Sequence, residues 1–454
     1  AGGPSWKPLP VVFATLIAPL WKLDHGLPPA LWMMVARAGA LLATALAFRL
    51  ASRLAGGGPA GVLAGVVASV ALVLTPDWFQ FAAHGSEAPL AVALMLWAIE
   101  RHLDGQRSHA LALGALACLL RPELVPFLGV YGAWAWMAQP SLRPLLAAVA
   151  VVLPVAWLAP EWIGSGNPFD AGAQARSEPV WSLSHAERPW LRALERVHNH
   201  TALVVELLAL GAVAAALARR QAVVLVLAAA ALAEAALFVA MTQGGFSGNP
   251  RYVLPALVIG AVLAGAGAGQ LARLLALRPT PAWRLAGVGA ALAAIAALAG
   301  GVVGARVDRL QFEAREVGRR MQVHGDLAEA VRRAGGPEVV LTTGTATSNR
   351  ALHTRLAWEL EVPMDAVEGL AGHSVIFRSS RDMLVGRVYM SGRAKRRVTM
   401  ARAGSIRVYR REGLSFPLAR REWRPVGDPF TSLLQGLHNP AKDGRIGAPR
   451  VVTR

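Results

Sequence analysis

Residues 58–100, GPAGVLAGVVASVALVLTPDWFQFAAHGSEAPLAVALMLWAIE, decide the fold class of this chain. They contain two apolar segments, 58–75 and 88–99, which are separated by the polar phrase HGSE at 84–87. About 20 apolar residues are enough to cross the roughly 30 Å of hydrocarbon in a bilayer. We therefore expect two consecutive membrane spans with Glu87 at a bilayer edge. A carboxylate is costly to desolvate there and is kept mainly where it serves a pathway or a site.

The composition of the whole chain agrees with a membrane protein. Of its 454 residues, 54% are hydrophobic and only 16% are charged, and the mean hydropathy is +0.42. This balance is too apolar for a soluble globular protein and predicts a polytopic membrane protein. The net charge of +18 is unevenly spread, because residues 305–454 hold more than half of the Lys and Arg. The single cysteine, Cys118, excludes a disulfide within the chain.

The apolar stretches predict about nine or ten spans, and a short interfacial helix is expected before them at residues 8–22. Two shorter apolar stretches flank the phrase Arg121-Pro122-Glu123, and residues 161–200 are expected to form a long polar loop. The expected apolar segments are 29–51, 58–75, 88–99, 109–120, 124–138, 144–160, 201–218, 222–242, 252–274 and 285–303.

The arginines of the short loops predict the orientation of the bundle. They fall on one side, which is therefore expected to be cytoplasmic, and the polar phrases at 76–87, 121–123, 161–200 and 243–251 then share the opposite face. The arginine-rich tail is expected on that face too, because long domains translocate largely regardless of charge. Anionic lipid or cell-wall polymer is a better partner for it there than nucleic acid.

The C-terminal region is expected to form a small extracytoplasmic α/β domain. We place the domains at residues 1–304 and 305–454. A helix is predicted over 306–334, a buried strand over 339–343, and a strand or hairpin over 398–410. Beyond about residue 425 few periodic apolar positions remain, so the end is expected to be loosely ordered.

The 84–87 phrase supplies the candidate catalytic residues, Glu87 and His84. A carboxylate there could orient an acceptor hydroxyl or hold a divalent cation. The alternative is a helix start, with Ser86 as the cap and Glu87 in the first turn.

The other candidates are substrate-binding residues: Arg121, Glu123, Arg251, Tyr252, Lys7 and His198. Arg121 beside Pro122 suits bidentate binding of a phosphate. It could instead pair with Glu123 or extend to the interface. Arg251 could meet an anionic head group and Tyr252 a sugar ring, although both residue types are also ordinary interface anchors.

Five further residues are weaker candidates or stay open. Lys7, His198 and His200 are weaker candidates, and Lys7 and His198 are the two expected to bind substrate. The pair formed by His198 and His200 lacks a second ligand cluster, so no zinc site is expected. The sequence does not decide whether Glu206 and Glu234, which lie within spans, are hydrogen-bond partners or proton-path groups.

The order of several short motifs resembles a known family, the bacterial GT-C membrane glycosyltransferases that use polyprenyl-phosphate-linked sugars. The branch it most resembles is that of the mycobacterial terminal arabinofuranosyltransferases, over about residues 5–300. The motifs are Lys7-Pro8-Leu9-Pro10, Gly85-Ser86-Glu87-Ala88-Pro89-Leu90, Leu120-Arg121-Pro122-Glu123 and Pro250-Arg251-Tyr252-Val253-Leu254-Pro255.

The resemblance implies a multi-span bundle with interfacial helices and an outward-facing cavity, where a sugar moves from the polyprenyl phosphate to an acceptor hydroxyl by inverting displacement. Glu87 matches the second acidic position of that cavity, Arg121 the donor-phosphate region, and Arg251 the Arg-Tyr phrase. Lys7 matches the basic residue before the interfacial helix. The family's principal Asp would precede Ala1, so we expect an N-terminally truncated chain.

Two departures from the pattern leave substrate preference open: Ala88 stands where the branch has Thr, and Leu124 where it has Gly. We expect an enzyme of the bacterial plasma membrane whose substrates are a polyprenyl-phosphate sugar and a glycan, lipid or protein acceptor. No cofactor is certain, and a divalent cation is possible. The alternatives are a transporter or lipid flippase, which would also carry ionisable groups within spans, and an inactive glycan-binding relative.

Overall fold

The computed structural model describes residues 7–24, 26–176, 182–276, 280–348, 352–367, 375–379 and 397–411. The described part is mainly helical and divides into two compact units, Ala1–Val317 and Gly318–Arg454. The division falls inside one long helix, thirteen residues after the boundary that the sequence suggested. The expectation of a loosely ordered end beyond residue 425 lies outside the described residues.

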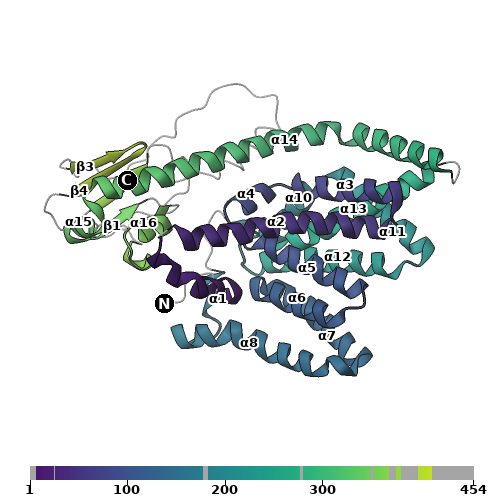
Figure 1. The fold of residues 1–454 in the computed structure, drawn as a ribbon, viewed down its shortest axis with the longest axis horizontal. Coiled ribbons are helices and arrows are strands. Elements are labelled where there is room, and N and C mark those ends of the chain that lie inside the picture. Colours follow the sequence, from purple (N-terminus) through teal and green to yellow (C-terminus); the bar gives the residue numbers. More distant parts are fainter. Residues whose placement is uncertain are drawn as a thin grey trace. The chain divides into compact units, whose positions relative to one another are not determined.

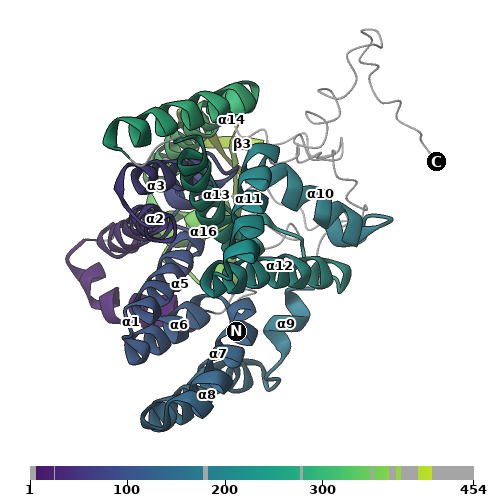
Figure 2. The ribbon, with the colours of Figure 1, turned by 90° about the vertical axis from the view of Figure 1, so that its right-hand side faces the viewer.

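The first unit is a bundle of helices (Figures 1 and 2). Its helices of more than six residues are α1 (Pro8–Ile17), α2 (Leu27–Leu54), α3 (Gly58–Val73), α5 (Ala88–Leu103), α6 (Arg107–Leu120), α7 (Val125–Ala138), α8 (Arg143–Ser165), α10 (Pro189–Thr201), α11 (Leu203–Arg219), α12 (Ala222–Gln243), α13 (Leu254–Leu275) and the start of α14 (Pro281–Arg333). Short pieces connect them: η1 (Ala18–Lys22), α4 (Trp78–Ala83), η2 (Pro122–Leu124), η3 (Pro140–Leu142), α9 (Asp170–Gln174), η4 (Leu183–His185) and η5 (Pro250–Tyr252).

Helix α13 is the centre of this bundle and packs against α3 on one side and α11 on the other (Figure 2). Its glycines allow this close approach. A Cβ at Gly265 would overlap the carbonyl oxygen of Ala64 on α3, and one at Gly267 would overlap that of Leu208 on α11. Small residues let helix backbones pack closely within membranes. The Ala/Gly-rich composition is therefore a packing device here.

Five of the described helices are long and apolar enough to cross a membrane: α2, α8 with η3, α12, α13 and α14. Helices α10 and α11 form a sixth candidate span if they count as one, although they meet at 89°. The expected number was higher, because several apolar stretches form helices shorter than a full crossing. Helix α3 has 16 residues and α6 has 14, against about 20 for a perpendicular span.

The expected polar loop at 161–200 is wrong in part, because α9 and α10 lie within it. Helix α10 separates charged from apolar residues along its length, and the chain bends sharply after it at Ala202, whose φ is +80°. A backbone in the left-handed region is uncommon for a residue with a side chain. Hydropathy alone gave no sign of this bend.

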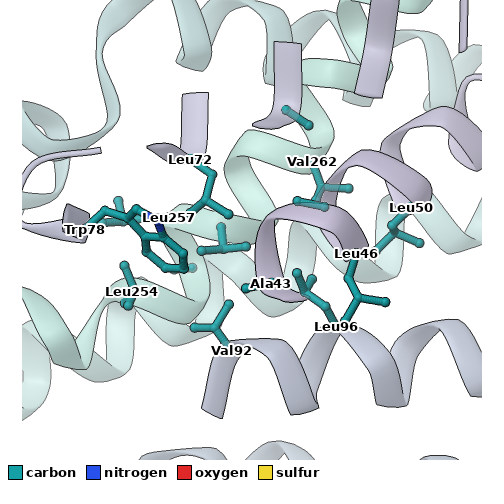
Figure 3. Packing of buried hydrophobic residues seen from close by; sticks show 14 of the residues in the cluster. Ala43, Leu46, Leu50, Leu72, Trp78, Val92, Leu96, Leu254, Leu257 and Val262 are labelled. Atoms are coloured by element: carbon teal, nitrogen blue, oxygen red, sulfur yellow. The ribbon is translucent and has the colours of Figure 1, made fainter. Parts of the chain in front are cut away.

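The main core of the bundle is formed by α2, α3, α5 and α13 (Figure 3). Leu50 of α2, Leu72 of α3 and Leu96 of α5 are at most 1% exposed. Trp78, the first residue of α4, packs into the same core (Figure 3). Its burial anchors the connection that leads from α3 to Glu87.

The second unit contains a four-stranded sheet of order β1-β2-β4-β3, made of β1 (Ala346–Ser348), β2 (Val375–Ser379), β3 (Arg397–Ala403) and β4 (Ile406–Arg411). Strands β1 and β2 are parallel and the other pairs antiparallel. The helices α15 (Gly336–Thr343) and α16 (His353–Glu359) and the end of α14 complete the unit, with η7 (Met364–Ala366). Their apolar residues form a core with one face of the sheet.

Two expectations for this unit are confirmed and one is wrong. The helix over 306–334 is part of α14, and the hairpin turns at Gly404, whose φ is +48°. Residues 339–343, however, belong to helix α15 and not to a strand. Pro337 and Glu338 in its first turn are helix-start signals that outweigh the β-branched run behind them.

Candidate functional site

Four side chains of the candidate site stand at helix ends. Lys7 precedes α1, Glu87 precedes α5, Arg121 follows α6, and Arg251 lies in η5 before α13. Arg121 is in an extended conformation, with φ −141° and ψ 102°, as the residue before a proline requires. The positions at which these helices begin and end therefore determine where the four charged side chains lie.

The site lies at one end of α5, and the arginine-rich loops lie at the other. Arg49 pairs with Glu100 at 3.3 Å, and Arg53 with Asp104 at 2.6 Å. Twelve helical residues lie between Glu87 and Glu100, and sixteen between Glu87 and Asp104, which corresponds to about 20–25 Å. This separation matches the two-sided distribution of polar phrases and arginines. Which end is extracytoplasmic stays a prediction.

The centre of the site is a chain of ion pairs. Glu87 accepts a hydrogen bond from Nζ of Lys7, which is 80 residues away in sequence, and its Oε1 lies 3.0 Å from Nη2 of Arg121. Nη1 of Arg121 donates to Oε1 of Glu123 at 3.1 Å. Arg121 is 2% exposed and Glu123 6%. The pairing of Arg121 with Glu123 therefore forms. Glu87 directly precedes α5, and its carboxylate meets the cations and makes no cap hydrogen bond, whereas Oγ of Ser86 accepts from the amide of Ala88 at 3.3 Å.

Tyr252 connects a third cation to this cluster. The guanidinium carbon of Arg121 lies 5.6 Å from the centre of the Tyr252 ring, and that of Arg251 lies 5.1 Å from it. Nη2 of Arg251 also donates to the Tyr252 hydroxyl at 3.3 Å. The backbone of η5 is fixed in turn by Asn249, whose side chain accepts from the Arg251 amide. Two guanidinium groups thus share one aromatic ring.

The pKa values of Glu87 and Lys7 reflect the burial of these groups and the charges beside them. Burial alone would raise the pKa of Glu87, but the charges of Arg121 and Lys7 outweigh it and lower that pKa to about 2. Burial lowers the pKa of Lys7 to about 8, although the attraction of Glu87 opposes the shift. At neutral pH Glu87 is ionised and Lys7 is still mainly protonated.

The described site has buried donors that make no hydrogen bond. Nε of Arg121 and Nε of Arg251 are buried and have no hydrogen-bond partner among the described residues, and Nη2 of Arg121 has only its ion pair with Glu87. A buried unsatisfied donor is costly. Three cations (Lys7, Arg121 and Arg251) outnumber the two carboxylates (Glu87 and Glu123) that pair with them. The arrangement can therefore accept an anion.

Two of the candidates from the sequence have exposed side chains. His84 is exposed at the end of α4. His198 is largely exposed, and its Nδ1 lies 2.8 Å from Oε1 of Glu206. His200 is the buried member of the His198/His200 pair.

A second ionic cluster forms around Asp77, which belongs to the same polar phrase, 76–87, as Glu87. Nη2 of Arg309 donates to Asp77 at 2.8 Å, and its Nε donates to Glu313 at 3.0 Å. Nε2 of His200 lies 3.4 Å from Asp77. Burial would raise the pKa of Asp77, but its bonds and charge interactions with His200 and Arg309 lower it.

The α14 side of this second cluster was missed by the sequence analysis, which assigned residues 306–334 to the tail. Arg306 donates to the carbonyl oxygens of Leu74, Asn199 and His200, the groups left open at the ends of α3 and α10. Glu313 is an acidic residue of a basic helix, and it is only 2% exposed. Its burial would have indicated this cluster, but burial cannot be read from the sequence.

Glu234 of α12 is a third buried carboxylate in reach of the site. It is 3% exposed, and it interacts electrostatically with Glu123 and Arg121. Its Oε2 has no hydrogen-bond partner among the described residues. Those residues also include no group of three or more His, Cys, Asp or Glu side chains that could hold a metal ion.

The apolar helices of the bundle define the class of protein, a polytopic membrane protein. A solved structure of the GT-C fold resembles the chain over most of its length, and this likeness gives the fold: ArnT from Cupriavidus metallidurans bound to undecaprenyl phosphate. The TM-score is 0.50 with 15% sequence identity, and the match covers 90% of this chain and 89% of ArnT. No protein-family model and no curated protein matches the sequence.

Proposed function

We propose that this protein is a membrane glycosyltransferase that moves a sugar from a polyprenyl-phosphate donor to an acceptor hydroxyl. The observation that carries the proposal is the cluster of buried Arg121 with the part-buried Lys7 and Arg251, with its unsatisfied donors and its excess of cations over paired carboxylates. The likeness to ArnT, which was solved with undecaprenyl phosphate, supports the same class of donor.

The charge of the site fits the chemistry of such a donor. A polyprenyl-phosphate sugar is a phosphodiester with one negative charge, which the excess of cations over paired carboxylates balances. When the acceptor hydroxyl attacks the anomeric carbon, the bond from that carbon to the phosphate oxygen breaks and the phosphate gains negative charge. Cations fixed in a dry site stabilise this developing charge more than the ground state, which lowers the barrier.

Glu87 has a positioning role in the resting site, because a carboxyl group with a pKa near 2 is a poor base. A bound phosphate would draw Lys7 and Arg121 away from Glu87. Since those two cations are what lower its pKa, donor binding would raise the affinity of Glu87 for a proton. Glu87 can then accept the proton of the acceptor hydroxyl, and this couples base strength to the presence of the donor.

The test is sugar transfer by the full chain in lipid vesicles, with radiolabelled polyprenyl-phosphate hexoses and pentoses. Replacing a preorganised charge-stabilising donor costs about 10²–10³ in kcat, so Arg121→Ala should lose transfer by about that factor. Arg143→Ala removes an exposed arginine at the start of α8 and serves as the matched control. Equal activity of the two variants would contradict the proposal.

The same experiment distinguishes the finer assignments. A pentose preference would support the arabinofuranosyltransferase branch. Movement of labelled substrate across the vesicle membrane without transfer would favour a transporter or flippase. The acceptor is proposed to be a glycan, lipid or protein of the cell envelope. The arginine bias of the loops supports a bacterial plasma-membrane location with the C-terminal domain outside.

A further inference from the structure

Glu234 is the only charged residue among the 22 residues of α12, which is one of the candidate spans. Twelve helical residues precede it and nine follow it, so about 13 Å of helix or more separates it from either end. A carboxyl group at such a depth in a membrane helix is costly and by default marks a function. Its place in the helix therefore indicates a role in what the protein does.

Glu234 faces the interior of the bundle. The buried residues of α12 are Val224, Leu227, Glu234, Phe238 and Thr242, and their spacings of three, four and seven place them on one face of the helix. Phe238 belongs to the main core, whereas Val224 and Leu227 belong to a second apolar cluster. Glu234 lies between them in sequence and is 3% exposed, so its short side chain does not reach the bilayer interface.

The charged groups that act on Glu234 belong to the Arg121–Glu123 ion pair. Glu123 and Arg121 both interact with it electrostatically. Helix α12 packs against α10, α11 and α13 (Figure 2), and among the described residues of those three helices no charged group acts on it. Oε2 of Glu234 is buried and has no hydrogen-bond partner in the described part of the chain. The carboxyl group is therefore within electrostatic range of the ion pair but does not belong to it.

A proton on Glu234 removes two costs of its position. As a carboxylate it would be buried without a hydrogen bond and would repel Glu123, and both are unfavourable. As a neutral acid it has an O–H that can donate. The charges of the site agree with this state. An ionised Glu234 would be a third carboxylate beside Glu87 and Glu123, and the three cations would then have no excess with which to hold a phosphate.

We propose that Glu234 is a phosphate-binding residue of the donor site, a neutral carboxyl group whose O–H donates to the phosphate of the lipid-linked sugar. The inference rests on the proposed function and adds a residue to it. A phosphate oxygen can accept from the Glu234 hydroxyl while the same phosphate accepts from Nε of Arg121, which lacks a partner. The phosphate gains negative charge as the sugar leaves, so this hydrogen bond strengthens during the reaction.

The test is binding of undecaprenyl phosphate to the full chain in detergent micelles, measured by native mass spectrometry. Glu234→Leu replaces the carboxyl group by an apolar side chain of similar size, which suits the interior of a span. It removes one hydrogen bond to a charged group, so the affinity should fall about 10- to 100-fold. Glu234→Gln keeps a neutral N–H donor at the same place and should bind nearly as well as the unsubstituted chain.

The matched control is Glu100→Leu, at the opposite end of α5 from Glu87. Glu100 is also 3% exposed, and its Oε2 is also buried without a hydrogen-bond partner among the described residues. Since twelve helical residues separate it from Glu87, its loss should leave the binding of undecaprenyl phosphate unchanged. Thermal unfolding of all variants checks that they are folded.

Infrared spectroscopy gives a readout that a purely structural role would not move. The carbonyl band of a protonated carboxyl group should be present in the unsubstituted chain and lost in Glu234→Gln, and Glu100→Leu should retain it. Undecaprenyl phosphate should shift this band, because the O–H then donates to the phosphate. This measurement needs no apolar variant, so it decides the question even where Glu234→Leu unfolds.

Three outcomes would overturn the inference: unchanged or tighter binding by Glu234→Leu, an equal loss in Glu234→Leu and Glu234→Gln, or no band that Glu234→Gln removes. Tighter binding would show that an ionised carboxylate repels the phosphate. Arg121→Ala separates this inference from the proposed function. If Arg121→Ala weakens binding and Glu234→Leu does not, the role of Glu234 alone fails; if Arg121→Ala binds as the unsubstituted chain does, the donor site itself fails.

Discussion

Replacing Glu87 by Gln should destabilise the protein far more than replacing Glu87 and Lys7 together. The pKa of Glu87 falls from 4.5 to about 2, which corresponds to about 3 kcal/mol in favour of the folded state. This contribution is present above about pH 4.5 and is lost as the pH falls toward 2. The pKa of Lys7 falls from 10.5 to about 8. Its protonated form therefore costs about 3 kcal/mol below pH 8, and this cost is relieved as the pH rises from 8 to 10.5.

The two contributions nearly cancel at neutral pH, as is common for buried ion pairs. Glu87→Gln alone leaves Lys7 beside Arg121 without its partner, so the expected loss is about 3–5 kcal/mol. Lys7→Met with Glu87→Gln removes both charges, and the expected change is within about 1 kcal/mol. The measurement is the free energy of unfolding of these two variants and of Lys7→Met alone, from denaturant titrations in detergent followed by tryptophan fluorescence.

The pH dependence gives a second readout of the same variant. Glu87→Gln removes the attraction that raises the pKa of Lys7, so that pKa should fall below about 8 and Lys7 should lose its proton closer to neutral pH. The reasoning is refuted if Glu87→Gln is as stable as the unsubstituted chain. It is also refuted if the losses of the two single variants simply add in the double variant.

The remaining predictions concern the packing and the second ionic cluster. Gly267→Ala should lower the free energy of unfolding by about 1–3 kcal/mol, because its Cβ would overlap the backbone of Leu208. The control is Gly260→Ala on the same helix, whose Cβ would meet nothing within 4 Å and which should be neutral or slightly stabilising. Thermal unfolding of both variants checks this. Asp77→Asn should weaken the bond to Arg309 and abolish the loss of stability on acidification that the lowered pKa of Asp77 predicts below about pH 4; unfolding midpoints at pH 3 and pH 7 check this.

Much of the class and part of the site could be predicted from the sequence. The hydropathy pattern predicted a helical membrane bundle. The strand-like residues on both sides of Gly404 predicted the hairpin that turns there. The pairing of Arg121 with Glu123 was one of the alternatives stated for Arg121, since only Pro122 separates the two residues. These features depend on local sequence, so no knowledge of distant contacts was needed.

The rest of the site depends on the tertiary path of the chain. Asp77 and Glu87 are ten residues apart, yet they enter different clusters, because the buried Trp78 fixes the connection between them. Asp77 instead meets Arg309, 232 residues away, and Glu87 meets Lys7, 80 residues away. Sequence spacing carries no information about such partners.

The sequence by itself determined that the protein is a membrane helix bundle, because a bilayer requires long apolar segments whose backbone groups are satisfied internally. It also determined which cationic and acidic residues were available. Only the tertiary structure decided which of them share a site. The close packing of α13 against α3 and α11 sets the helix positions, and those positions bring the charged helix ends together or keep them apart.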